Sequence, residues 1–440
     1  MKEEIGGTIG KLTWKLTDGN TLIISGNGDM QNYDFGFDGP NYYTDAPWVN
    51  ERFKTVVIET GITSIGAGAF FYCENLTSII IPNSVINIGE NAFAGCGNLT
   101  SINIESENSS YVSEDGVLFN KSKTILICCP QQKAGKYTIP HNVKSIGNSA
   151  FSHCNNLTSI IIPNSVTSIG KWAFSHCNLT SILIPDSVTS IGNGAFLFCD
   201  HLTSILIPNS VTSIGANAFQ SCKNLPSIVL PNNITSIEEL TFYDCTSLTS
   251  IAIPNGVVSI GSWAFYKCTN LTSVTIPKSV VSFGSNAFTY CKNLKILTNL
   301  NPVPVNIGYN VFDGVNIDKC TLEVPMGSVA EYKEANIWKN FKIKGIDVGI
   351  AETDNYPSLR VYPNPTTGVL NLIQETINNE QLTINNIEIF DICGKKIFLS
   401  TRSLVHSSTI TMDISHLTAG IYFVKISTET GEVVRKIVKQ

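Results

Sequence analysis

Apolar residues recur along most of the chain with one long, fixed period. The repeated unit reads C-x-N-L-T-S-I-x-I-P-N-S-V-T-S-I-G-x-x-A-F-x-x, and its clearest copies begin at Cys73, Cys154, Cys177, Cys199, Cys222, Cys245 and Cys268. Successive cysteines from Cys199 to Cys291 stand 23 residues apart, and the step from Cys177 to Cys199 is 22 because one residue is missing. A period of this length is typical of a solenoid of stacked coils, in which each coil contacts its neighbours.

A single copy predicts which positions face the interior. The segment from Leu76 to Ile81 has the L-x-x-L-x-L pattern of a leucine-rich-repeat strand, so its positions 1, 4 and 6 are predicted to point inward and the others outward. Pro82 and Asn83 end the strand, because proline cannot donate to a ladder and asparagine favours turns. The following A-F sequence predicts a short helical or 3-10 turn that buries alanine, phenylalanine and the next cysteine.

Two residue types return once per coil and are expected to stack along the core. The phenylalanines of the A-F sequence are predicted to form one continuous column of ten rings: Phe70, Phe93, Phe151, Phe174, Phe196, Phe219, Phe242, Phe265, Phe288 and Phe312. Most of the 13 cysteines occupy another recurring position. Stacked copies about 5 Å apart leave disulfides possible, but a ladder of small buried thiols is the simpler interpretation. There is no C-x-x-C pair, so zinc and redox motifs have no support, and we expect no cofactor.

Departures from the repeat predict the domain boundaries. Residues 1–55, with two strands around an Asp-Gly turn, are expected to cap the N-terminal end, because an uncapped first coil would expose its apolar side. Residues 56–346 form the solenoid, with a variant hairpin coil at about 105–140, where the cysteine spacing widens to 58. Residues 347–358 read as a polar linker. Residues 359–440 show short strands broken by Gly and Asn, which predicts a small β-sandwich. The expected fold class is therefore mainly β.

The charge of the chain argues against nucleic-acid binding, and its hydropathy argues against a membrane-spanning helix. Charged residues make up 15% of the chain and the net charge is −6, with no Lys/Arg cluster long enough to follow a phosphate backbone. Nucleic acid is therefore not an expected partner. No apolar run reaches the roughly 18 residues that a membrane-spanning helix needs, so no transmembrane helix is expected.

Candidate catalytic and metal-binding residues are few. His153 and His176 occupy the same position in adjacent coils, so their rings are predicted to lie side by side. A two-ligand metal site or a pH-sensitive pair is one interpretation; duplicated surface histidines on the convex turn are the interpretation we favour, since no acid stands at a matching position. The Asp-rich stretch from Asp29 to Asp45 lacks a calcium-loop pattern and is expected to be a polar loop. No nucleophile, base and orienting group come together, so we expect no enzyme.

The outward fifth position of each strand is the best candidate for a binding surface. Its occupants are Ile80, Asn103, Ile161, Leu183, Leu206, Val229, Ala252 and Thr275. From Ile161 to Val229 they form an apolar stripe on a face that is normally open to solvent, and large exposed apolar patches mark interaction sites. The alternative is that aliphatic and β-branched residues simply suit a flat parallel sheet.

The repeat resembles the bacterial BspA-like leucine-rich repeat family, whose S-V-T-S-I-G-x-x-A-F signature appears at residues 165–174. The similarity covers roughly residues 10 to 346. It implies a right-handed β-solenoid with parallel strands, and roles in surface attachment or in binding host proteins.

The tail is similar to the C-terminal sorting domain of type IX secretion cargo in Bacteroidota. Three blocks carry the resemblance, and the residues singled out in them are Tyr362, Pro363, Asn364, Pro365, Gly368, Gly394, Gly420, Tyr422 and Lys436. The resemblance implies export across the outer membrane by the type IX machinery, often followed by cleavage and attachment to surface lipopolysaccharide. Residues 1–6 lack the apolar segment of a secretory signal, so either that signal has been removed or export is in doubt.

Together these features predict a monomeric, non-enzymatic protein at the outer-membrane surface or outside the cell. Its expected partners are a host or environmental protein or glycan and the type IX machinery. The alternatives are a structural surface-layer component without a specific ligand, and a non-catalytic module associated with a secreted hydrolase.

Overall fold

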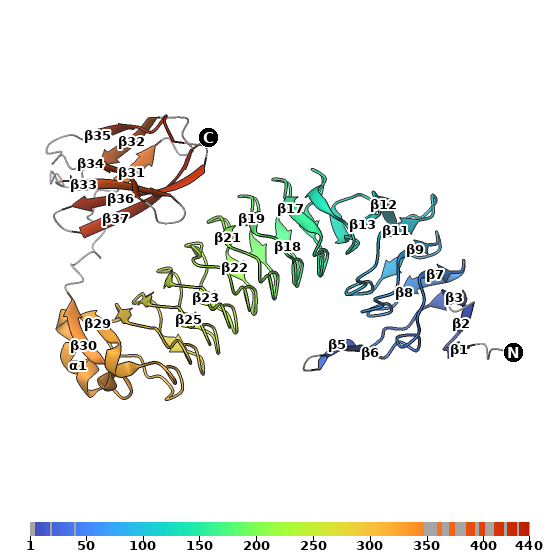
Figure 1. Cartoon of the computed structure of the whole chain (residues 1–440), viewed down its shortest axis with the longest axis horizontal. Helices are drawn as coiled ribbons and strands as arrows, with labels where there is room; N and C mark the ends of the chain where they lie inside the picture. Colours follow the sequence, from blue (N-terminus) through green and yellow to red (C-terminus); the bar gives the residue numbers. More distant parts are fainter. Residues whose placement is uncertain are drawn as a thin grey trace. The chain divides into compact units, whose positions relative to one another are not determined.

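The computed structural model describes residues 5–17, 20–38, 41–346, 359–362, 369–374, 384–391, 396–400, 409–417, 420–428 and 431–439. The chain divides into two compact units, Met1–Ile346 and Asp347–Gln440. The first unit is a β-solenoid whose coils lie side by side along its axis (Figure 1).

One side of the solenoid carries a parallel ladder built from the L-x-x-L-x-L segments. It begins with an antiparallel cap, β1 to β3, and continues in parallel from β3 onward. The strands on this side are β1 (Ile5–Ile9), β2 (Leu12–Thr17), β3 (Thr21–Gly26), β7 (Thr55–Ile58), β9 (Ser78–Ile81), β11 (Ser101–Ile104), β15 (Gly135–Thr138), β17 (Leu157–Ile161), β19 (Ser181–Leu183), β21 (Ser204–Leu206), β24 (Ser250–Ala252), β26 (Ser273–Ile276), β28 (Ile296–Asn299), β29 (Thr321–Pro325) and β30 (Lys342–Ile346).

This ladder is interrupted where the repeat is irregular. One break lies between β11 and β15, at the variant coil. A second separates β17 from β19, and β19 lies in the coil that has lost one residue. A third lies between β21 and β24, in the coil where Pro226 replaces the usual threonine. Neighbouring coils join here through a threonine N–H, as in the 2.9 Å bond from Thr203 N to Thr180 O. Proline has no N–H, which explains the third break.

The S-I dipeptides form a second parallel ladder of shorter strands, which is divided among three sheets. Its members are β4 (Gly28–Asp29), β8 (Ile62–Ile65), β10 (Asn87–Ile88), β12 (Tyr111–Glu114), β13 (Val117–Asn120), β14 (Ile125–Cys128), β16 (Ser145–Ile146), β18 (Ser168–Ile169), β20 (Ser190–Ile191), β22 (Ser213–Ile214), β23 (Ser236–Ile237), β25 (Ser259–Ile260) and β27 (Ser282–Phe283). The strands β12, β13 and β14 pair in antiparallel fashion and form the variant coil.

The third side of each coil is a corner built around the Ala-Phe pair. Its N–H groups bond three residues back, as from Ser175 N to Trp172 O at 3.1 Å, and also to the next coil, as from Phe174 N to Ala195 O at 2.8 Å. The three-residue spacing is that of a 3-10 turn. In each corner but the last, two residues have positive φ, so the turns do not continue into a regular helix.

The core follows the predicted stacking, with one correction. The buried phenylalanines stack at centroid distances from 5.0 to 5.8 Å, but in two columns, Phe70 with Phe93 and then Phe151 to Phe312. The predicted single column of ten rings is therefore wrong. The variant coil has no Ala-Phe pair, so the buried core divides there into two clusters.

The twelve described cysteines are free thiols. In the regular coils each Sγ donates to the carbonyl of a phenylalanine on the preceding coil, for example Cys177 to Phe151 O and Cys245 to Phe219 O, both at 3.0 Å. Burial raises the pKa of Cys199 and of Cys245 to about 12.

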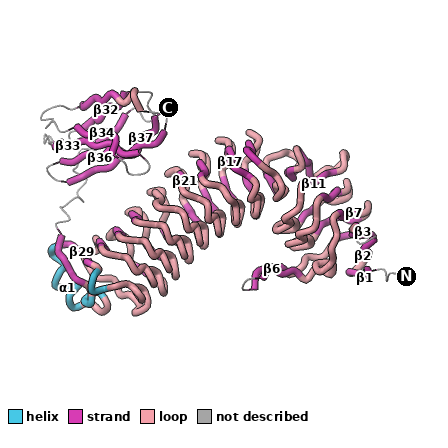
Figure 2. Tube along the Cα trace, in the orientation of Figure 1, coloured by secondary structure: helices cyan, strands magenta, loops and turns pink. Residues whose placement is uncertain are grey.

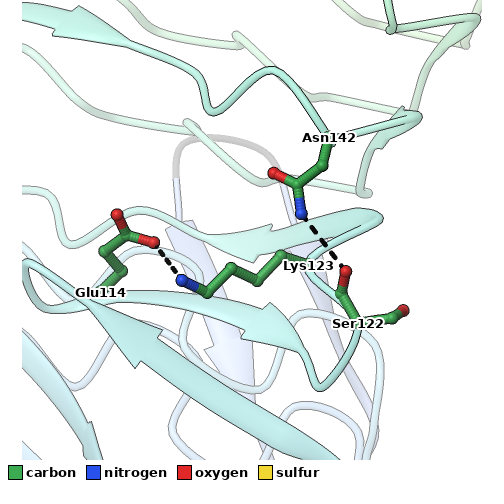
Figure 3. A network of polar contacts seen from close by, with 4 residues as sticks. All are labelled: Glu114, Ser122, Lys123 and Asn142. Carbon is green, nitrogen blue, oxygen red and sulfur yellow. Dashed lines mark hydrogen bonds and ion pairs between the residues drawn. The ribbon is translucent and has the colours of Figure 1, made fainter.

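The variant coil is tied together by polar contacts on its outer side. Lys123 forms an ion pair with Glu114, and the adjacent Ser122 carbonyl accepts a hydrogen bond from Asn142 at 3.3 Å (Figure 3). Asn142 belongs to the next coil, so this network joins the hairpin to the solenoid.

Aromatic residues and short helices close the ends. At the N-terminal end Trp48 stacks on Phe70, and its Nε1 donates to Ala69 O at 2.8 Å. At the other end Trp338 packs edge-on against Phe312. Among the described residues, helix occurs only at that end (Figure 2): η1 (Ile317–Lys319), η2 (Met326–Ser328), α1 (Val329–Glu334) and η3 (Trp338–Asn340).

The second unit is the β-sandwich, with two antiparallel sheets in the described residues. One sheet has the order β31-β32-β35 and the other β34-β33-β36-β37. The strands are β31 (Leu359–Tyr362), β32 (Val369–Gln374), β33 (Ile384–Asp391), β34 (Lys396–Ser400), β35 (Thr409–Asp413), β36 (Gly420–Thr428) and β37 (Gly431–Lys439). Its described core includes Ile389, Ile414 and Val424, all fully buried.

Candidate functional site

The sheet face presents the predicted stripe to solvent. Leu183 is 62% exposed and Val229 54%, Ile80 and Ile161 are also exposed, and Leu206 is half-buried. Ala252 and Thr275 are exposed as well. Register places Leu183 directly beside Leu206, and Ala252 beside Thr275. The apolar part of the stripe therefore runs over the coils between Ile161 and Val229.

The threonines that flank this stripe are tied to the backbone. The hydroxyl of Thr203 donates to Thr180 O at 3.0 Å, and that of Thr272 donates to Thr249 O at 2.9 Å. Each hydroxyl thus supports the junction between two coils. The side chain at the fifth position of each strand on this face points outward and varies from coil to coil.

The corners contain two further variable positions, of which sequence reasoning singled out only His153 and His176 as candidate functional residues. The first corner slot precedes the Ala-Phe pair, and the second follows the phenylalanine by two residues. Except at Asn310 in the last corner, φ in both slots lies between 53° and 78°. The second slots are Tyr72, Gly95, His153, His176, Phe198, Ser221, Asp244, Lys267, Tyr290 and Gly314. The signal was available in the repeat, since these slots stand among the letters written x on either side of A-F.

A cavity of about 490 Å³ lies where the variant coil leaves a corner out. The corner ending at Gly95 is followed in space by the corner containing His153, with which Tyr72 makes direct contact. The hairpin of β5 (Phe35–Asp38) and β6 (Asn41–Thr44) projects from the N-terminal coils (Figure 1) and contributes Phe35 and Tyr42 to the lining. We call this space the corner cavity.

Two tyrosines and two histidines form one wall of the corner cavity. The rings of Tyr42 and Tyr72 stack at 3.8 Å, and those of His153 and His176 at 4.2 Å with an angle of 9°. The hydroxyl of Tyr72 lies 2.6 Å from His153 Nε2, and that of Tyr42 lies 3.1 Å from His176 Nε2. Gly95 makes this possible, because a Cβ there would lie 2.2 Å from the Tyr72 ring.

The histidine pair is therefore side by side, as predicted, but the expectation of solvated surface residues is wrong. Both rings are half-buried beneath the hairpin. Burial, with the neighbouring His176, lowers the pKa of His153 to about 3. Burial also lowers the pKa of His176, against the opposing effect of Asp200. Neither ring carries charge near neutral pH, so each can accept a hydrogen bond from a tyrosine.

The other candidates for metal chemistry are engaged within the chain. Asp29 accepts a hydrogen bond from the Thr63 hydroxyl at 2.6 Å, and Asp45 accepts one from the backbone N–H of Asp34 at 2.7 Å. The described ranges contain no group of three or more His, Cys, Asp or Glu residues suited to hold a metal ion. Across those same ranges, no helix is both long and apolar enough to cross a bilayer.

The sorting-tail residues are only partly described. Tyr362 ends β31, Gly420 begins β36 and Lys436 lies in β37. The Tyr422 side chain is buried in the second unit. The remaining predicted residues, Pro363, Asn364, Pro365, Gly368 and Gly394, lie outside the described residues.

Comparison with known families matches both parts of the chain. The family described as BspA type leucine rich repeat region matches in six copies, over residues 47–132, 127–229 and 212–336. The secretion system C-terminal sorting domain matches residues 360–440. A comparison with curated proteins gives no match.

Solved structures similar to the chain include three bacterial leucine-rich repeat proteins. One from Eubacterium ventriosum is 28% identical, with 65% of this chain and 95% of that one covered and a TM-score of 0.44. A leucine rich cell surface protein from Faecalibacterium prausnitzii is 26% identical, with coverage of 67% and 94% and a TM-score of 0.31. One from Bacteroides ovatus is 22% identical, with coverage of 77% and 99% and a TM-score of 0.33.

Proposed function

The chain belongs to the BspA-type leucine-rich repeat family and ends in a type IX sorting domain, which makes it a secreted or cell-surface protein, and we propose that it is a non-catalytic adhesion protein. Its sheet face binds a host or environmental protein or glycan, and its tail engages the type IX secretion machinery. The solenoid spans residues 56–346, the linker 347–358 and the sorting sandwich 359–440.

The exposed stripe on the sheet face is the observation that supports this proposal. Leu183 and Val229 are both more than half exposed, although the coils around them bury nearly every other aliphatic residue. Covering such a side chain contributes roughly 1–2 kcal/mol. Several exposed aliphatic side chains in one row provide the apolar contact area for specific binding once a partner excludes water from them. Isolated exposed aliphatics need no explanation, but a contiguous row on successive coils does.

The proposal is tested by placing charge on the stripe of the full chain. Leu183 and Leu206 are both replaced by lysine, and binding to immobilised extracellular-matrix proteins and to a glycan array is measured. We expect at least a tenfold loss of binding, because a lysine ammonium in a dry contact is strongly unfavourable.

A matched control carries the same two charges on another face of the same coils. Thr189 and Thr212 are exposed and directly precede β20 and β22, and lysine at both is expected to leave binding within twofold of wild type. Equal loss in the two double variants, or unchanged binding in the Leu183/Leu206 variant, contradicts the proposal. Absence of any bound partner for the wild type would favour a structural surface-layer role.

A further inference from the structure

The structure assigns a second binding site to the corner cavity: we propose that it binds a neutral sugar ring of a glycan. This site is separate from the sheet face. It shares with the proposed function only the premise that the protein meets the extracellular medium.

The corner cavity is formed by a specific departure from the repeat. Corners normally stack in contact, but the variant coil has no Ala-Phe pair. Cys129 takes the place of the phenylalanine, since its N–H donates to Ala150 O at 2.7 Å, and a gap remains between the corner slots of Gly95 and His153. Tyr72 reaches across that gap to His153, and the hairpin brings Tyr42 against His176. The resulting space of about 490 Å³ is within the size range of small-molecule sites, about 300–1,000 Å³.

The residues that line it occupy backbone positions that disfavour them. Positive φ suits glycine, or asparagine at small cost, whereas a bulky L-residue there is unfavourable by roughly 1–2 kcal/mol. The cavity nevertheless has Trp172, Phe198 and Leu240 at φ of 54°, 56° and 58°. The corner does not require these side chains, because Gly194 fills an equivalent slot in the same row. Large side chains with positive φ also occur at corners outside the cavity, as at Trp263 and Tyr290, so the strain belongs to the repeat. The cavity is distinctive because three such side chains line one space.

The chemistry of the lining selects a neutral ligand with both apolar and hydroxyl surface. The lining contains no Asp, Glu, Lys or Arg, and its two histidines are held neutral. Aromatic rings supply flat apolar faces, as Trp172 does. Asn217 and Gln220 bond each other and keep further hydrogen-bonding capacity, and Ser149 adds a hydroxyl. A charged ligand would lose its hydration without gaining a partner there.

The two kinds of group in the lining match the two kinds of surface on a sugar ring. A sugar ring offers C–H faces for the aromatic rings and several hydroxyl donors at its edge. An aromatic peptide side chain offers one donor at most, so the sugar fits this combination better.

The test uses the full chain and two tryptophans in equivalent slots. Trp172 lines the cavity and Trp263 does not, yet both have φ of 54° and both are 36% exposed. Replacing either with glycine keeps a residue that favours this backbone conformation, and thermal unfolding by circular dichroism confirms that each variant is folded. Binding of the methyl glycosides of glucose, galactose, mannose and N-acetylglucosamine is measured by calorimetry and by tryptophan fluorescence.

We expect at least one glycoside to bind the wild type, with Kd raised at least tenfold in Trp172→Gly and changed less than twofold in Trp263→Gly. The Leu183/Leu206 lysine variant should bind the glycoside normally, which separates this site from the sheet face.

Three results would overturn the inference. They are the absence of millimolar binding for every glycoside, equal losses in the two tryptophan variants, and binding of N-acetyltyrosine amide without binding of any glycoside. The last result would assign the cavity to an aromatic side chain of a protein partner.

Discussion

The sheet face and the corner belong to the same coils but tolerate variation differently. On the sheet face, inward aliphatics and backbone-bonded threonines occupy most positions, and the fifth position varies mainly among aliphatic residues and threonine. At the corner, the two slots of positive φ carry glycine, asparagine, histidine, tryptophan, tyrosine, aspartate and lysine. A repeat can therefore keep one core while it offers a uniform surface on one side and a chemically varied one on the other.

The largest expected difference in stability is between a buried residue of the corner and an exposed strand residue of the same coil. Phe196 is fully buried between two other rings, so Phe196→Ala should lower the free energy of unfolding by about 3–5 kcal/mol. Leu183→Ala, at a 62% exposed position, should change it by less than about 0.5 kcal/mol. Urea denaturation measures both. Similar losses would show that the sheet face, too, is part of the structural core.

Acid should weaken the corner cavity specifically. The folded pKa of His153 is about 3, below its unfolded value of about 6.5, so the unfolded chain binds more protons between these values. Stability from this group is present above pH 6.5 and declines as the pH falls toward 3, by up to about 1.4 kcal/mol per pH unit. Chemical denaturation at several pH values measures the slope. His153→Asn keeps a residue that tolerates positive φ and should flatten this slope.

Backbone strain in the corner slots gives a smaller effect of either sign. Gly194 has φ of 60°, and a Cβ there would lie 2.5 Å from the Trp172 ring, so Gly194→Ala should lose about 1–2 kcal/mol of stability. Leu240→Gly, at φ of 58°, should be neutral or stabilising despite the smaller side chain. Thermal unfolding distinguishes these outcomes. A clear loss of stability in Leu240→Gly would show that the backbone at Leu240 is not strained.

The smallest expected effect comes from restoring the missing hydrogen bond on the sheet face. Pro226→Thr restores the missing N–H donor, and the new hydrogen bond contributes about 0.5–1.5 kcal/mol. Without the proline the unfolded chain has more conformational freedom. This lowers the free energy of unfolding by about 0.4–1 kcal/mol and offsets part of the gain. Hydrogen exchange should nevertheless show new protection at residue 226. An unprotected amide there would mean that proline is not the cause of the break.

Sequence reasoning reached the coil but not the corner cavity. The 23-residue period and the L-x-x-L-x-L pattern predicted the strands, the buried phenylalanines and the exposure of Leu183, because each follows from local alternation. The corner cavity depends on contacts between residues 42 and 176 and between residues 72 and 153. No period links these pairs. The sequence shows that the variant coil lacks an Ala-Phe pair. It does not show that a cavity results, because this depends on Gly95 leaving room for the Tyr72 ring to lie across the gap.

The thiol at each regular corner has a practical consequence for following the protein. Each is buried, its proton is held by a phenylalanine carbonyl of the preceding coil, and its raised pKa keeps it from reacting as a thiolate. A coil must open before its cysteine reacts with an alkylating agent. Mass spectrometry of timed labelling would therefore report the opening rate of one coil at a time. The molecule carries a built-in set of probes for whether it frays from its ends or opens in the middle.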